Sequence, residues 1–402
     1  MTGARKSREN RWEIEVEELA ARLERGESPF VIDLRNPEEF RRWRIEGRQP
    51  LAVLHVPYYE VLAEAEDEDV VVAAKAYAMR HWTGRLPRRG LIVVVCAHGG
   101  TSGYVAQGLR ELGYQAVSLR GGMQAWADHY EVVPVVVDED LTVYQVKRPA
   151  RGCLSYVVAS GGEAVIIDPL RHVDRYLQLV REKDLAVRRV LDTHAHADHI
   201  SGGPRLAAVL GVPYHLHPYD AIHPMDVLPA TFAYEPVADG QRFRIGRATL
   251  QALHVPGHTL GQVVYLLNGR YLFSGDTIFV DAIARPDLGG RAQTWTPLYF
   301  QSLRRLLHLP DDTLVLPGHY SRPQEADAAG RVVAVLGELK QANEGLLAVA
   351  AGEGAFAGFI MARLPEFPPQ YVDIKRVNTG LLHPTEEQAT ELELGPNVCA
   401  LA

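Results

Sequence analysis

Imidazole and carboxylate side chains that could bind a metal ion are concentrated in one short segment. Residues 194–199 contain three histidines and one aspartate. More donors follow along the chain, and the candidate set is His194, His196, Asp198, His199, His258, Asp276 and His319. Each cluster of donors follows an apolar run that predicts a β-strand, and loops at one end of a sheet converge. Because these residue types bind zinc and iron, the sequence predicts a metal site at the strand ends.

A second chemical feature is Cys96, which lies between a predicted buried strand at 91–95 and a predicted helix at 101–112. Backbone N–H groups and the positive end of the helix dipole stabilise a thiolate in such a position. Cys96 is therefore predicted to act as a nucleophile toward sulfane sulfur. With Cys153 and Cys399 the chain has three cysteines, too few for a disulfide framework. We therefore expect a reducing compartment, most simply the cytoplasm.

The first third of the chain alternates strands and helices. Apolar runs at 30–34, 91–95 and 115–119 predict buried strands of the kind found in parallel sheets. The helix predicted at 101–112 presents Val105 and Leu109 on one face. A strand, a helix and a strand at this spacing form a βαβ unit, so the fold class is α/β with a parallel sheet.

A β-rich section follows. The strands predicted at 155–158 and 164–168 flank two glycines, which indicates a hairpin. Pro134 lies in an extended apolar run that ends in acidic residues, which favours an inter-domain connection. The predicted domains are 1–133, a linker at 134–141, and 142–402, the last with a helical C-terminal tail.

Charge and hydropathy exclude several classes of partner. The formal net charge of −8 argues against nucleic-acid binding, which needs a clustered positive face. No apolar run is long enough to span a membrane, and residues 1–11 are charged and lack the apolar segment of a signal peptide. We therefore expect neither nucleic acid nor membrane as a partner. The sequence leaves open whether the chain forms homo-oligomers.

Residues 12–130 resemble a single rhodanese domain. The resemblance rests on residues 31–35, on the Cys96 loop and on residues 119–126. It implies that Cys96 carries sulfur as a persulfide. Rhodanese loops commonly have an arginine before the loop serine, where it binds the sulfonate end of thiosulfate. This chain has Thr101 there, which favours a persulfide such as glutathione persulfide as sulfur donor.

The histidine segment resembles the metallo-β-lactamase superfamily, over roughly residues 142–380. The resemblance implies an αβ/βα sandwich with the metal at one edge of two sheets. Persulfide dioxygenases of this superfamily imply one Fe(II) bound by His194, His258 and Asp276, which leaves open positions for sulfur and O₂. The residues that would then orient these ligands are His196, Asp198, His199 and His319.

Glyoxalase II, a dinuclear zinc hydrolase of the same superfamily, implies a different use of the same residues. There His196 would join His194 and His258 on one ion, and Asp276 would bridge to a second. The ligands of that second ion would be Asp198, His199 and His319. The sequence retains every one of these residues, so it does not separate mononuclear iron from two zinc ions.

The residues that follow Asp276 also resemble persulfide dioxygenases. In that family an arginine after the metal aspartate holds a glutathione carboxylate, and Arg285 fits because a guanidinium binds a carboxylate through two hydrogen bonds. The alternative for Arg285 is a salt bridge that closes its own loop. A tyrosine just after the last histidine contacts the substrate in the family. Tyr320 is the candidate here, one position earlier than in the family pattern.

Fusion of the two modules implies one function, because a covalent tether raises the local concentration of shared intermediates. The sequence predicts a sulfurtransferase–persulfide dioxygenase that oxidises glutathione persulfide with O₂ to sulfite in sulfide detoxification. Cys96 would exchange sulfur between persulfide, sulfite and thiosulfate. Two alternatives remain: a dinuclear zinc thioester hydrolase of the glyoxalase II kind, and a sulfur carrier or docking protein with a vestigial metal site.

Overall fold

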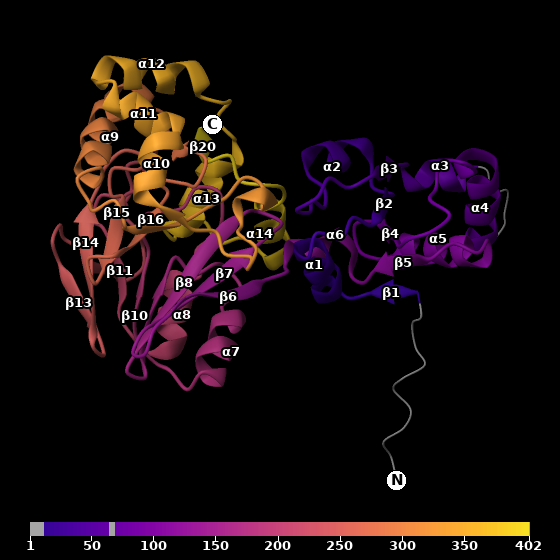
Figure 1. The fold of residues 1–402 in the computed structure, drawn as a ribbon, viewed down its shortest axis with the longest axis horizontal. Coiled ribbons are helices and arrows are strands. Elements are labelled where there is room, and N and C mark those ends of the chain that lie inside the picture. Colours follow the sequence, from indigo (N-terminus) through magenta and orange to yellow (C-terminus); the bar gives the residue numbers. More distant parts are fainter. Residues whose placement is uncertain (1–11, 64–68, 402) are drawn as a thin grey trace, which may run out of the picture. The chain divides into compact units, whose positions relative to one another are not determined.

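The computed structural model describes residues 12–63 and 69–401 and divides into two compact units, residues 1–129 and 130–402 (Figure 1). Residues 1–11, on which the expectation about a signal peptide rests, lie outside the described part of the chain. Within the described part, no helix is both long and apolar enough to cross a membrane.

The N-terminal unit is built on a five-stranded sheet in the order β1-β5-β4-β2-β3, with every neighbouring pair parallel. Its centre is an apolar β-branched run that is fully buried between two parallel neighbours, as the sequence predicts. This confirms the α/β class of this part. The strands are β1 (Glu13–Ile14), β2 (Phe30–Asp33), β3 (Val53–His55), β4 (Ile92–Val95) and β5 (Ala116–Leu119).

Helices connect these parallel strands and cover the sheet. The amphipathic face predicted for 101–112 is present in α5, where Val105 and Leu109 pack into the same core as Ile92 and Val94. The helices are α1 (Val16–Glu24), α2 (Pro37–Arg42), α3 (Tyr58–Leu62), α4 (Val70–Tyr77), the π-helical turn η1 (Ala78–Trp82), α5 (Gly100–Glu111) and α6 (Gly122–Ala127).

The C-terminal unit contains two large sheets. The first is seven-stranded in the order β12-β11-β10-β9-β8-β7-β6, and the second is six-stranded in the order β13-β14-β15-β16-β18-β19. The first comprises β6 (Glu131–Val137), β7 (Thr142–Arg148), β8 (Cys153–Ser160), β9 (Glu163–Ile167), β10 (Ala186–Leu191), β11 (Tyr214–Leu216) and β12 (Glu235–Pro236). The second comprises β13 (Arg242–Ile245), β14 (Ala248–His254), β15 (Val263–Leu267), β16 (Tyr271–Gly275), β18 (Leu314–Pro317) and β19 (Ala334–Val335).

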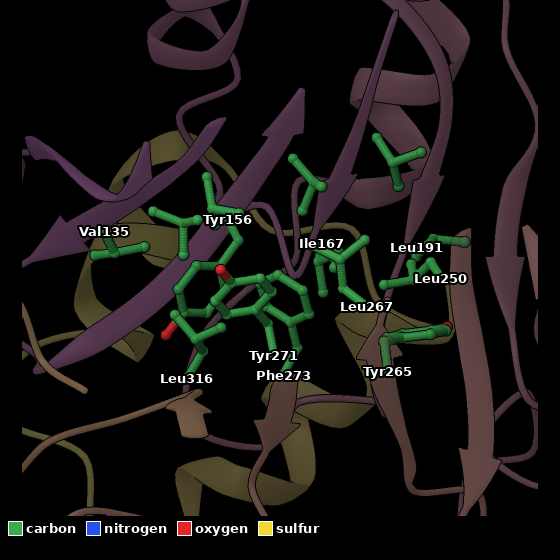
Figure 2. Packing of buried hydrophobic residues seen from close by; sticks show 14 of the residues in the cluster. Val135, Tyr156, Ile167, Leu191, Leu250, Tyr265, Leu267, Tyr271, Phe273 and Leu316 are labelled. Carbon is green, nitrogen blue, oxygen red and sulfur yellow. The ribbon is translucent and has the colours of Figure 1, made fainter. Parts of the chain in front are cut away.

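The two sheets face each other across one hydrophobic core (Figure 2). Tyr156 of β8 meets Phe273 of β16 edge to face, with ring centroids 5.0 Å apart. Because strand residues alternate between faces, neighbouring Val157 points to the opposite side, where it packs with Tyr176 and Leu206. Burial on both faces explains why these strands read as continuous apolar runs.

Helices cover the outer face of each sheet, which completes the predicted αβ/βα sandwich (Figure 1). Helices α7 (Asp174–Glu182) and α8 (Gly203–Leu210) pack on the first sheet. Those on the second are α9 (Ala292–Leu306), α10 (Leu336–Ala342), α11 (Glu344–Ala350) and α12 (Glu353–Arg363). The remaining elements are β17 (Ile283–Ala284), η2 (Pro323–Glu325), α13 (Gln370–Asn378), α14 (Glu386–Leu392) and β20 (Ala400–Leu401).

The segment expected to be a linker, 134–141, differs from that expectation. Its first four residues belong to β6, which pairs antiparallel with β7. Pro134 sits opposite Tyr144 and cannot donate a ladder hydrogen bond. Because β6 is the edge strand of its sheet, the proline is tolerated there.

The C-terminal tail is tied to the histidine segment through Glu393. This buried carboxylate lies 2.8 Å from Arg148 and 3.0 Å from Arg171, and accepts a hydrogen bond from the backbone N–H of Ile200 at 2.7 Å. Burial opposes ionisation of Glu393, but the two arginines outweigh it and hold the pKa at about 2. The tail therefore fixes the backbone next to His199 through a buried charge.

Replacing Glu393 with glutamine removes a charge that two buried arginines need. We expect Glu393→Gln to lower the free energy of unfolding by about 3–5 kcal/mol. In the wild type this contribution is present above the ordinary glutamate pKa and is lost as the pH falls through about 2. Urea unfolding at neutral pH tests this, with the exposed neighbour Glu391→Gln as the control. Equal unfolding midpoints for the two variants would contradict it.

Candidate functional site

The predicted donors lie at the ends of strands from both large sheets. The segment 193–199 follows β10, and the other three donors follow strands β14, β16 and β18 of the facing sheet. All seven side chains are buried. Their position at one edge of the sandwich follows from the topology, since these four strands all end there.

Three of these residues converge on one point. His194, His258 and Asp276 each place a ligand atom within 4.8 Å of the others. His258 Nε2 lies 3.4 Å and His194 Nε2 lies 3.8 Å from Asp276 Oδ2. None of these three buried atoms has a hydrogen-bond partner, whereas buried polar atoms almost always do. Ligands about 2 Å from one metal ion lie at comparable separations, so the three residues fit a divalent cation.

Hydrogen bonds select the ring nitrogen that is left for the metal. His258 Nδ1 lies 2.7 Å from the carbonyl oxygen of Arg285, so it must donate, and Nε2 keeps its lone pair. Thr193 Oγ1 donates to Asp168 Oδ2 at 2.9 Å and therefore accepts from His194 Nδ1, also at 2.9 Å. Burial lowers the pKa of both imidazoles, which keeps them in the neutral form that binds metals.

His196 lies in a neighbouring group with Asp168 and Asp192. Its Nε2 is 3.3 Å from Asp168 Oδ1, and the ring stacks edge-on to His194 with centroids 4.2 Å apart. Burial raises the pKa of Asp192 to about 6. His196 therefore belongs to a group with Asp168 and Asp192, whereas His194 belongs to the group with Asp276.

The remaining predicted donors form a second group beside the first. His199 Nδ1 is 3.1 Å from Asp198 Oδ1, while His319 stands between two carboxylates. Its Nδ1 lies 2.6 Å from Asp276 Oδ1 and its Nε2 lies 2.9 Å from Asp198 Oδ2. Burial opposes protonation of His319, but the two carboxylates outweigh it and raise its pKa well above the ordinary value. Asp276 thus faces the first group with one oxygen and the second with the other.

Two cysteines, neither of them among the predicted donors, lie against this second group. Cys153 Sγ is 3.5 Å from Asp198 Oδ2 and 3.7 Å from His199 Nδ1. Burial and Asp198 disfavour its thiolate, but His199 and His319 outweigh them and lower its pKa to about 7. Cys399 Sγ lies within 4.8 Å of donor atoms of Asp198, Asp276 and His319, because β20 pairs with β17. Burial raises the pKa of that thiol well above its ordinary value.

Arg285 and Tyr320, the two residues with predicted substrate-binding roles, are both buried. The Arg285 side chain is fully buried and bidentate to Asp287, with Nε–Oδ1 2.6 Å and Nη2–Oδ2 2.9 Å, and it also donates to the carbonyl of Pro365. Its contribution to the site is its backbone carbonyl, which orients His258. Tyr320 is buried in the core between the sheets. The Arg285–Asp287 pair is the salt bridge within the loop that the sequence offers as the alternative to substrate binding.

In the N-terminal unit, Cys96 lies at the end of β4 in a loop that leads into α5. Its Sγ accepts a hydrogen bond from the Gly99 N–H at 3.2 Å and lies 3.2 Å from Ser102 Oγ, which in turn is 2.8 Å from Ser118 Oγ. Gly99 has φ +88°, which turns its N–H toward the sulfur. The Gly99 N–H therefore donates to the sulfur, and the Ser102 hydroxyl lies within hydrogen-bond distance of it.

Comparison with known families matches both parts of the chain. Residues 148–319 match the model of the metallo-beta-lactamase superfamily. Residues 15–129 match the model of the rhodanese-like domain.

Individual relatives match part of the chain. The human mitochondrial persulfide dioxygenase ETHE1 is 34% identical over 180 residues, which is 44% of this chain and 66% of that protein. A hydroxyacylglutathione hydrolase of Xanthomonas euvesicatoria is 35% identical over 163 residues, which is 40% of this chain and 58% of the relative. The crystal structure of a metallo-beta-lactamase from Staphylococcus aureus has a TM-score of 0.53 and 27% identity, over 61% of this chain and 74% of that one.

Thr193→Val tests whether the Asp168–Thr193–His194 chain of hydrogen bonds tunes a metal ligand. The variant keeps the side-chain shape but removes the oxygen that holds His194 Nδ1. We expect metal affinity to fall about 10- to 100-fold, measured by competition with a chelator. Thr249→Val, an exposed threonine on β14, is the control. Unchanged affinity in Thr193→Val would show that this hydrogen bond does not position a ligand.

Proposed function

The chain contains a metallo-beta-lactamase domain and a rhodanese-like domain, and we propose that it is a sulfurtransferase–persulfide dioxygenase. The proposed substrate is glutathione persulfide. With O₂ and water it would give glutathione, sulfite and two protons. The rhodanese-like domain would pass sulfur between persulfide, sulfite and thiosulfate.

The observation that carries this proposal is the set of three unpaired buried atoms on His194, His258 and Asp276. Two imidazoles and one carboxylate on one face are the ligand set of non-haem Fe(II) oxygenases. His194, His258 and Asp276 would hold a ferrous ion, which would supply the redox chemistry for the reaction of the persulfide with O₂. The donors include no thiolate, which agrees with a harder metal than a thiolate-rich site prefers.

The residues around this triad act by orientation. Thr193 accepts a hydrogen bond from His194 Nδ1, and the Arg285 carbonyl accepts one from His258 Nδ1. These bonds leave Nε2 of both rings directed toward Asp276. His319 holds the second oxygen of Asp276, so that Oδ2 alone faces the triad. Burial of the whole group excludes bulk water, which strengthens each of these interactions. In this proposal Asp198, His199 and His319 orient ligands.

In the rhodanese-like domain, Cys96 is the proposed sulfur carrier. The donors around its Sγ stabilise sulfur anions, so the loop is suited to a cysteine persulfide. Thr101 in place of the loop arginine removes a sulfonate-binding charge. This supports glutathione persulfide over thiosulfate as the preferred donor.

The second candidate is a dinuclear zinc thioester hydrolase of the glyoxalase II kind. The observation that favours it is the position of Asp276, with one oxygen toward each donor group, as a bridging carboxylate would lie. The similarity to a hydroxyacylglutathione hydrolase points in the same direction. Two thiols, Cys153 and Cys399, beside the second group distinguish this chain from an all-nitrogen and oxygen donor set.

Metal analysis combined with an oxygen electrode separates the candidates. The proposal predicts one iron per chain in protein purified without added metal, and O₂ uptake on addition of glutathione persulfide. Two zinc ions per chain with hydrolysis of S-lactoylglutathione would replace the proposal with the hydrolase. Absence of both metals and both activities would leave a sulfur carrier or docking protein.

Cys96→Ser tests whether the two chemical sites are independent. Serine lacks the sulfur nucleophile, so sulfur transfer to cyanide or sulfite should fall to background. O₂ uptake with added glutathione persulfide should stay within about twofold of the wild type, because that step uses the other domain. Ser102→Ala, which keeps the sulfur, should retain measurable transfer. Loss of O₂ uptake in folded, iron-loaded Cys96→Ser would disprove independent sites.

A further inference from the structure

A cavity of about 260 Å³ lies beside the candidate metal triad. Ala195, which stands between His194 and His196, and Thr259, which follows His258, both line it. The wall also contains Tyr219, Arg291, Trp295 and Lys375. A molecule in this cavity would therefore lie against the two segments that carry the triad histidines.

Lys375 brings a buried positive charge to the wall of this cavity. Its side chain is only 3% exposed, and Nζ donates to the carbonyl of Ala195 at 2.9 Å. An ammonium group has three hydrogens to donate, and Ala195 uses one.

The other charges of the wall leave it positive overall. Arg291 is exposed, and its guanidinium makes no ion pair within the described part of the chain. Asp220 is the one acidic residue among those lining the cavity, and backbone and hydroxyl groups already hold its oxygens. They accept from Ala195 N at 2.8 Å, Thr259 Oγ1 at 2.7 Å and Gly261 N at 2.8 Å. Lys375 and Arg291 together outnumber this one carboxylate, so the wall has a net positive charge toward an anionic ligand.

We propose that this cavity is the binding site for the anionic part of the thiol substrate, with Lys375 and Arg291 binding the carboxylates of glutathione persulfide. This assignment rests on the proposed function for the reaction at the triad. Trp295 and Leu260 provide an apolar wall for the methylene groups of such a tripeptide. The Arg285 guanidinium, by contrast, is paired with Asp287 in this structure.

Trp295 lies in the cavity wall, so ligand binding can be followed by tryptophan fluorescence. The chain has five tryptophans, at positions 12, 43, 82, 126 and 295, so Trp295 is the one in the C-terminal unit. S-methylglutathione, which has both carboxylates but no persulfide to oxidise, should change the tryptophan emission of the full-length protein in a saturable way. In Trp295→Phe the emission change should disappear while calorimetry still detects binding.

Arg291→Met removes one proposed carboxylate partner without touching the triad. We expect the Kd for S-methylglutathione to rise about tenfold, the effect of losing one charged hydrogen bond. The KM for glutathione persulfide should rise by a similar factor, while kcat stays close to the wild type. Arg304→Met, an exposed arginine on α9 outside the cavity wall, should behave as the wild type.

These measurements keep the cavity and the proposed function distinct. Binding of S-methylglutathione without O₂ uptake would retain the site and reject the dioxygenase. O₂ uptake with equal Kd and KM values in Arg291→Met and Arg304→Met would retain the dioxygenase and reject the cavity assignment. Tighter binding of S-methyl-coenzyme A than of S-methylglutathione, weakened equally by Arg291→Met, would reject glutathione as the thiol.

Discussion

Buried polar atoms without hydrogen-bond partners set the main constraint on this structure. Each buried polar atom without a hydrogen-bond partner costs about 1–3 kcal/mol of folding free energy. His194 Nε2, His258 Nε2 and Asp276 Oδ2 are three such atoms, and they lie close together. A cation at their centre satisfies all three at once. The hydrogen bonds made by Nδ1 of His194 and His258 orient both rings so that the Nε2 lone pairs point toward this centre.

The C-terminal segment fixes the loop that carries the first histidines of the site. Lys375 and Asn378 of α13 bind backbone carbonyls of the histidine segment, and Asn378 reaches those of both His196 and His199. Glu393 holds the N–H of Ile200 from the other side. The two sheets bring the ligands to one edge, and the tail fixes the loop that presents them. Stability of the tail and integrity of the metal centre are therefore coupled.

The sequence predicted what depends on local pattern: the apolar runs of β4 and β8, the βαβ unit, and the donors at strand ends. The sequence did not predict contacts between residues that are far apart in the chain. Cys399, for example, reaches the site only through the pairing of β20 with β17. For Arg285 the sequence left two local alternatives open, substrate binding and a salt bridge within its own loop, and the structure contains the salt bridge to Asp287. Pro134 favours a linker in the sequence, but it lies in the edge strand β6, where a proline is tolerated. The sequence does not reveal this, because which strand lies at the edge is decided by the assembled sheet.

The most direct test of the central claim is a crystal structure of protein purified without added metal, with anomalous data collected at the iron and zinc absorption edges. The account predicts one iron atom per chain, bound by His194 Nε2, His258 Nε2 and Asp276 Oδ2. Two zinc atoms bridged by Asp276, with Asp198 and His319 on the second, would contradict it.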